Sequence, residues 1–171
     1  VANAEIYADT RETVEHNLES QLGVLKWERP IPVDLSGEVI GAMPTWIRET
    51  DEERIQNLAH IIDEHADDMF EVTVKLDGSS MTIFYDERVE GRTGVCGRQW
   101  WFTNDNQNTI CRVARESGIL TYLHMHKLNI AIQGEIIGPK IQSNKDRLKT
   151  QQFFVFNIFD INKSWLWSMD R

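Results

Sequence analysis

The feature that most constrains the fold is a change of hydrophobic period near residue 71. Upstream, residues 50–66 open with Thr-Asp-Glu-Glu and continue with apolar residues three or four apart, which predicts a capped helix. Downstream, the apolar residues alternate with polar ones, which is typical of strands. The chain therefore changes from helix to sheet at the point where a lysine, Lys75, interrupts the first alternating run.

Five strands are predicted after this change. The first three are separated by GSS and by a turn at DERVEG, and a helical stretch at 106–126, broken at Gly118, precedes the last two. The last strand is apolar on both faces, so we expect it to be central in its sheet. The predicted class is α+β, with mainly antiparallel sheets and flanking helices. The five strands are EVTVKLD (71–77), MTIFY (81–85), RTGVCGR (92–98), NIAIQGEIIG (129–138) and FFVFNIFDI (153–161).

The N-terminal part has a different organisation. Residues 10–22 predict a short helix that ends at Gly23, and residues 24–47 hold three of the four prolines, which favours an extended linker. We expect residues 1–30 to be the end of a preceding domain or a linker. Residues 31–171 then form the N-terminal portion of a second domain.

Charge and cysteine usage narrow the functional classes. The net charge is −9, but residues 1–71 carry 17 acidic and 5 basic side chains whereas residues 72–171 carry 10 and 13, so the second part is mildly basic. No apolar run approaches the length of about 20 residues that a membrane helix needs, and no membrane partner is expected. Two cysteines without metal-ligand spacing favour a reducing, cytoplasmic location.

Lys75 and Asp77 lie two residues apart, so a strand would place both on one face, directly before Gly78. Glu135 lies next to Gly134 on another predicted strand, and we expect Arg92, Cys96 and Arg98 to share a face of a third. One lysine, two carboxylates and an arginine suit a nucleoside triphosphate with a hydrated divalent metal. A free lysine has a pKa of about 10.4, so a nucleophilic lysine needs burial or nearby positive charge.

Three ordered segments carry a family resemblance: 75-KLDG-78, 133-QGEIIGP-139 and 156-FNIFDI-161. They resemble the first three nucleotidyltransferase motifs of ATP-dependent polynucleotide ligases, and the GEIIGP wording resembles RNA ligases. The lead-in 37-GEVIGAMPTWIRETDEERIQN-57 is similar to that of RNA ligases with an N-terminal OB domain, which seal nicks that have a 3′-OH and a 5′-phosphate. The resemblance implies an ATP-grasp-like ligase adenylation fold.

The resemblance also implies roles for individual residues. Lys75 matches the lysine that forms lysyl–AMP, and Asp77 and Glu135 match carboxylates that contact the waters of a catalytic Mg²⁺ or Mn²⁺. Glu135 also matches a ribose contact. Arg98 matches an arginine near ribose or phosphate, and Phe159 matches the aromatic that stacks on adenine. The backbone at Val74–Leu76 matches the adenine-edge contacts. Ser80 falls where some RNA ligases have Asn, so no role is transferred to it.

Alternatives remain open from the sequence. Phe159 also fits plain core packing, and Arg98 fits a surface arginine. The basic run Lys140, Lys145, Arg147 and Lys149 fits either a solvated loop or a contact with RNA phosphates or triphosphate. The same motifs also fit an mRNA-capping guanylyltransferase, a DNA ligase, or a non-catalytic nucleotide- or RNA-binding module. Two further family motifs, E-G-x-x-x-K and K-x-K, do not follow Ile161. We therefore expect an incomplete adenylyltransferase domain with weak or absent adenylylation by this chain alone.

Overall fold

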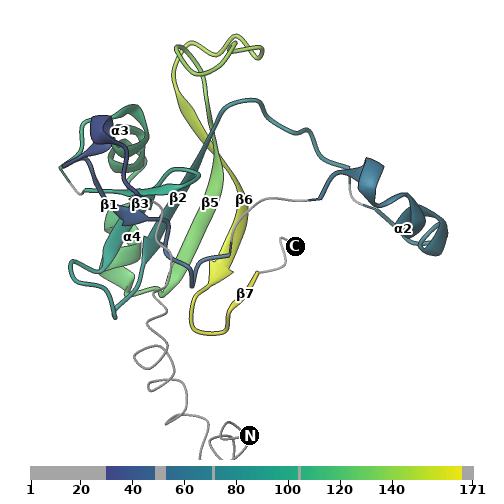
Figure 1. The fold of residues 1–171 in the computed structure, drawn as a ribbon, viewed down its shortest axis with the longest axis horizontal. Helices are drawn as coiled ribbons and strands as arrows, with labels where there is room; N and C mark the ends of the chain where they lie inside the picture. The colour runs from purple at the N-terminus through teal and green to yellow at the C-terminus, as the bar shows by residue number, and fades with distance from the viewer. Residues whose placement is uncertain (1–29, 49–52, 71, 104, 167–171) are drawn as a thin grey trace, which may run out of the picture. The chain divides into compact units, whose positions relative to one another are not determined.

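A computed structural model describes residues 30–48, 53–70, 72–103 and 105–166 (Figure 1). The chain divides into two units at Pro30, and the elements below belong to the second, which spans Ile31–Arg171. The helix predicted at 10–22 lies outside the described residues. In the part of the chain that the structure covers, no helix is long and apolar enough to cross a membrane.

Seven strands of the described residues form one sheet in which every neighbouring pair is antiparallel. Their order is β1-β4-β3-β2-β5-β6-β7. This arrangement confirms the predicted α+β class with mainly antiparallel pairing. The strands are β1 (Val39–Ala42), β2 (Ser79–Tyr85), β3 (Thr93–Cys96), β4 (Trp100–Phe102), β5 (Ile130–Ile137), β6 (Gln152–Asp160) and β7 (Trp165–Leu166).

Two helices, α3 (Thr109–Glu116) and α4 (Ile119–His126), pack on one face of this sheet (Figure 1). The Asn108 side chain caps α3 by accepting a hydrogen bond from the backbone N–H of Cys111 at 2.8 Å. Gly118 has a positive φ of 73°, which ends the first helix and allows the second to begin, as the sequence predicts. The larger core lies between these helices and the sheet. Its fully buried members include Met81, Ile83, Tyr85, Ala114, Leu123 and Ile136.

The opposite face of the sheet carries a smaller apolar cluster made of Ile47, Phe84, Cys96, Ala131, Phe159 and Ile161. The segment that contains Ile47 and Arg48 is held on this face, because the amide of buried Gln133 donates to the backbone carbonyl of Arg48 at 2.7 Å. Cys96 and Cys111 are buried and unbridged, and burial raises the pKa of both thiols.

The first predicted strand is wrong. Residues 72–77 form no strand, and Val72 and Val74, which alternation assigns to a buried face, are 92% and 83% exposed. Strand β2 begins instead at Ser79, so the two serines of GSS, which was predicted as a separator, belong to β2, and only Gly78 precedes it. A strand needs a partner for its backbone groups, and within the described residues β2 finds its partners, β3 and β5, only from Ser79 onward.

Strand β6 is not central, contrary to the prediction from its apolar sequence. It lies between β5 and the two-residue β7, near the edge of the sheet. Phe154, Val155 and Phe156 are therefore more than a third exposed. The third predicted strand is also shorter than expected: Arg92 and Arg98 lie outside β3, and Cys96 is buried, so these three side chains do not share a strand face.

Two upstream predictions need correction as well. Part of the predicted linker pairs with β4 as the edge strand β1, after a 3-10 turn at Val33–Leu35. The helix predicted at 50–66 is shorter, since a 3-10 turn at Ile55–Asn57 precedes α2 (Ala59–Glu64). Its predicted cap at Thr50 lies outside the described residues.

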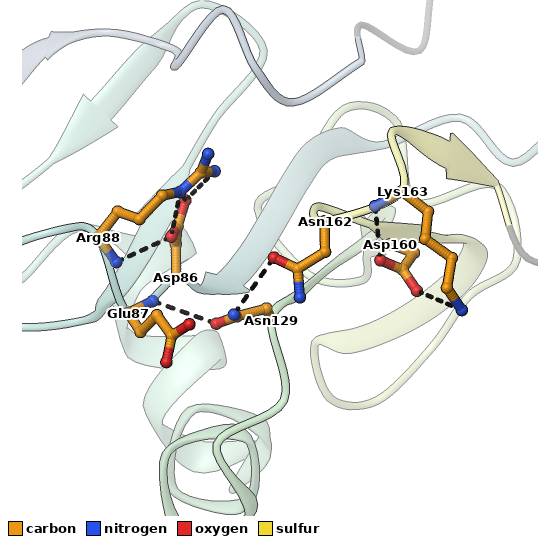
Figure 2. A network of polar contacts seen from close by, with 7 residues as sticks. All are labelled: Asp86, Glu87, Arg88, Asn129, Asp160, Asn162 and Lys163. Carbon is orange, nitrogen blue, oxygen red and sulfur yellow. Dashed lines mark hydrogen bonds and ion pairs between the residues drawn. The ribbon is translucent and has the colours of Figure 1, made fainter.

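Short turns at one end of the sheet are joined by a polar network (Figure 2). The Asn129 side chain accepts from the backbone of Glu87 at 3.1 Å and donates to Asn162 at 3.4 Å, so it links the ends of β2 and β6 at the start of β5. Asp86, only 1% exposed, accepts three hydrogen bonds from the Arg88 guanidinium, at 2.9, 3.2 and 2.6 Å. This network closes the sheet end opposite to the one that carries Gly78.

Replacing Asp86 with asparagine is expected to lower the free energy of unfolding at pH 7 by about 1 to 2 kcal/mol. The hydrogen bonds from Arg88 lower the pKa of Asp86, so its carboxylate stabilises the fold above the unfolded value of about 3.9. That contribution disappears as the pH falls through the lower folded-state pKa. Chemical unfolding from pH 7 to pH 3 checks this prediction. The difference in the free energy of unfolding between wild type and variant should shrink below about pH 4, whereas a difference that stays constant contradicts the prediction.

Candidate functional site

Two of the predicted motif segments meet at one end of the sheet. Glu135 lies on β5 opposite Ser80 of β2, and its Oε1 accepts a hydrogen bond from the backbone N–H of Gly78 at 3.0 Å. This contact joins residues 57 positions apart in the chain. The half-buried carboxylate of Glu135 therefore lies directly beside the residue that follows Asp77.

The approach of the two segments requires glycine at position 78. A Cβ placed on Gly78 would lie 2.1 Å from the carbonyl oxygen of Ile136 and 2.6 Å from Cγ2 of Ile137. Both atoms belong to β5, whose backbone is fixed by pairing on both sides. The Asp-Gly pair thus places the backbone against β5, which is a steric requirement that alternation alone does not reveal.

Replacing Gly78 with alanine is expected to destabilise the protein by about 1 to 3 kcal/mol, because the start of β2 must move away from β5. Chemical unfolding measures the loss. The matched control is Gly41→Ala, where no atom lies within 4 Å of the added Cβ and the backbone is outside the positive-φ region. A Gly78→Ala variant that is as stable as wild type would contradict the close approach.

Asp77 is held by the connection between β5 and β6. Lys145 Nζ lies 2.7 Å from Asp77 Oδ2, and the Asp77 carboxylate also accepts a hydrogen bond from Ser143. Lys145 is the main cause of a lowered pKa of Asp77, and the positive charge of Lys75 adds to it. The pKa of Lys145 is raised in turn by the same pair. Asp77 is therefore a carboxylate anion at neutral pH.

Lys75 lies in the irregular segment before Gly78 and is exposed. It precedes Gly78 by three residues, so the chain brings it to the end of the sheet that carries Glu135. The prediction that Lys75 and Asp77 share a strand face is wrong, because neither residue belongs to a strand. Val74 is exposed and Leu76 half-buried, and their backbone contacts with a base stay a prediction.

Arg98 lies in the turn between β3 and β4 and is exposed. Because β3 runs antiparallel to β2 and Cys96 pairs with Thr82, the residues after Cys96 lie beside the start of β2. The turn that carries Arg98 is therefore at the same end of the sheet as Gly78.

Phe159 lies on the same sheet face as Glu135, since it pairs with Ala131 of β5, four residues before Glu135. Four strand residues span about 13 Å. The Phe159 ring is 3% exposed and packs in the smaller apolar cluster, so the structure shows it in a core environment. Its stacking on adenine stays a prediction.

The donor set fits a hydrated divalent cation. Glu135 accepts a hydrogen bond from the N–H of Gly78, the residue after Asp77, and both carboxylates have access to water because Asp77 is 48% exposed and Glu135 half-buried. Mg²⁺ is usually bound by one or two carboxylates together with waters and substrate phosphates. Among the described residues, no group of three His, Cys, Asp or Glu side chains is placed to hold a metal by itself.

Sequence reasoning missed the contribution of the β5–β6 connection to this site. Gln142 donates to the carbonyl oxygen of Gly78 at 3.3 Å, in addition to the Ser143 and Lys145 contacts with Asp77. The available signal is the basic run directly after the GEIIGP segment, which fits a solvated loop or a contact with RNA phosphates or triphosphate. Nothing in that run identifies Asp77 as a partner.

Comparisons with known proteins identify the family of this chain. The family model described as RNA ligase matches residues 68–171. No significant match was found among curated proteins. Among solved structures, a mutant of Naegleria gruberi RNA ligase with ATP and Mn is 44% identical, covers 89% of this chain and 44% of that chain, and has a TM-score of 0.71.

Two other structures of the Naegleria gruberi ligase are similar to the chain. A mutant with AMP and Mn is 41% identical, covers 93% of this chain and 48% of that one, and has a TM-score of 0.71. The ligase with PPi is 42% identical, with coverages of 96% and 47% and a TM-score of 0.69. The chain thus spans less than half the length of these proteins. The family match over residues 68–171 shows that the chain belongs to the RNA ligase family.

Proposed function

We propose that this chain is the N-terminal portion of the adenylyltransferase domain of an ATP-dependent RNA ligase. The observation that carries the proposal is the 3.0 Å contact between Glu135 and the backbone of Gly78, which brings the KLDG and GEIIGP segments together. Membership of the RNA ligase family and the similarity to a ligase with ATP and Mn support it.

The first step is attack of the Lys75 amine on the α-phosphorus of ATP. A bond forms between Nζ and phosphorus, the bond to the bridging oxygen breaks, and pyrophosphate leaves. The Lys75 ammonium loses two of its three protons to solvent, one before the attack and one after it, so the phosphoramidate nitrogen keeps one. Lysyl–AMP is the product. AMP then passes to the 5′-phosphate of an RNA end, and a 3′-OH displaces AMP to form the phosphodiester.

The remaining residues position the nucleotide. Asp77 and Glu135 hold a Mg²⁺ or Mn²⁺ ion through its waters, and the bound ion supplies positive charge to the triphosphate. In the same proposal Glu135 also contacts the ribose, Arg98 contacts ribose or phosphate, and Phe159 stacks on adenine. The backbone at Val74–Leu76 meets the adenine edge.

The partners follow from the reaction. They are ATP and RNA ends or a nicked duplex with a 3′-OH and a 5′-phosphate, as in RNA repair. A cytoplasmic location is part of the same proposal. The preference for ATP and for a ribose end distinguishes this function from capping, which uses GTP, and from DNA ligation.

The test uses the complete protein encoded by the reading frame that contains this chain. It is incubated with Mn²⁺ and with either ATP or GTP, together with nicks that end in 3′-ribose or in 3′-deoxyribose. We expect joining with ATP and the ribose end. Transfer of GMP from GTP in place of AMP from ATP would contradict the proposal. Joining only of nicks that end in 3′-deoxyribose would also contradict it. Thermal stabilisation by ATP without any covalent adduct would indicate a binding module instead.

A further inference from the structure

The β5–β6 connection, residues 138–151, is a braced loop. Asn144 exchanges two hydrogen bonds with the backbone of Leu148, both at 3.1 Å, and Gln151 donates to the carbonyl of Pro139 at 2.8 Å. Ile141 is buried and anchors the loop in the larger core. The loop is therefore fixed at its neck and within its tip, although its polar side chains are exposed.

This bracing determines where the tip delivers its polar groups. Gln142 contacts the carbonyl of Gly78, while Ser143 and Lys145 contact the Asp77 carboxylate. Three side chains of one loop thus contact two consecutive residues, Asp77 and Gly78. The positively charged Nζ of Lys145 lies 2.7 Å from Oδ2 of Asp77. Lys145 places positive charge where the proposed function places that of a divalent ion.

We infer that Lys145 is a built-in competitor of the divalent cation at Asp77, and that it regulates the metal affinity of this site. The inference rests on the proposed function in so far as Asp77 faces the metal. A divalent ion beside Asp77 repels the ammonium group at this range, so the ion pair and the bound metal disfavour each other. Because Lys145 is 71% exposed, it is free of packing that would prevent it from swinging away.

The competition has a defined size. An exposed ion pair is weak, so removal of Lys145 is expected to tighten Mn²⁺ binding about two- to fivefold rather than by orders of magnitude. Lys145→Arg keeps the charge and the reach to Asp77, and it should stay near the wild-type affinity. Lys149→Ala removes the same charge from the same loop, but no ion pair of Lys149 is recorded within the described residues, so it controls for the general field of the loop.

The experiment measures Mn²⁺ binding to the complete protein by electron paramagnetic resonance of the free ion, in the absence of ATP. Wild type, Lys145→Ala, Lys145→Arg and Lys149→Ala are compared, and unfolding without metal verifies that each variant is folded. A second arm repeats Lys145→Ala in an Asp77→Asn background. We expect tighter binding only for Lys145→Ala, and no effect of that substitution once Asp77 is neutral.

The contrary outcomes are distinct. Weaker or unchanged Mn²⁺ binding in Lys145→Ala overturns the competition, as does an equal gain in Lys149→Ala or a gain that persists in the Asp77→Asn background. Absence of Mn²⁺ binding to the wild type also overturns it. A different outcome separates the two proposals. If the variants show the expected Mn²⁺ affinities but the wild type forms no AMP adduct, the proposed ligase function is wrong, while the competition between Lys145 and the divalent ion is still supported.

Discussion

Replacing Lys75 with alanine is expected to abolish transfer of the labelled α-phosphate of ATP to the complete protein, leaving no detectable adduct. The physical reason is that the new phosphorus–nitrogen bond forms to Nζ of this residue, and alanine has no nucleophile. Lys75 is exposed and outside any strand, so the fold should be retained. The measurement is retention of radiolabel by the denatured protein after incubation with Mn²⁺ and ATP.

Two controls separate chemistry from charge. Lys75→Arg keeps the positive charge near Asp77 but presents a group that is charged at all accessible pH values, so it should also fail. Lys149→Ala removes a lysine from the β5–β6 connection and should be labelled like the wild type. Retention of label by Lys75→Ala would show that another residue is the nucleophile.

The second large effect is expected from Glu135→Ala, which should slow adenylylation about 100-fold. The substitution removes the acceptor for the backbone N–H of Gly78, and with it the contact that fixes the KLDG segment against β5. It also removes one of the two carboxylates that face the proposed metal. The measurement is the single-turnover rate of adduct formation at saturating ATP and Mn²⁺.

Glu135→Gln distinguishes the two contributions. Its side-chain carbonyl can still accept from Gly78, while the negative charge is lost. If the contact with Gly78 dominates, the Gln variant should recover much of the rate; if the charge dominates, both variants should be equally slow. A Glu135→Ala variant with the wild-type rate and normal folding would contradict any role of this contact.

Most of the sheet was predictable because its strands carry their signals locally. The DERVEG turn, the helix break at Gly118 and the strand at 130–137 follow from turn residues and alternation. The prediction of a strand at 71–77 was wrong for a non-local reason. Whether Val72 and Val74 are buried depends on a partner strand that the local sequence does not identify. The predicted central position of β6 was wrong for a similar reason, because apolar residues on both faces do not reveal that a strand lies near the edge of its sheet.

The site was predictable to a different extent. The motif order brought Asp77 and Glu135 into the same hypothesis, and the structure places them at one end of the sheet, but the contact runs through the Gly78 backbone rather than through metal alone. The pair of Lys145 with Asp77 was not predictable, because it depends on how the β5–β6 loop folds back. Phe159 shows the opposite problem, since the same sequence fits both a stacking aromatic and a core residue, and the structure shows the core environment.

The most direct test of the central claim is the site of AMP attachment. The complete protein is incubated with ATP and Mn²⁺, digested, and its peptides are analysed by tandem mass spectrometry under conditions that preserve the phosphoramidate. We expect one AMP on the peptide that contains KLDG, attached to Lys75. An AMP attached to any other residue, or a protein that joins RNA ends without an adduct, would contradict it.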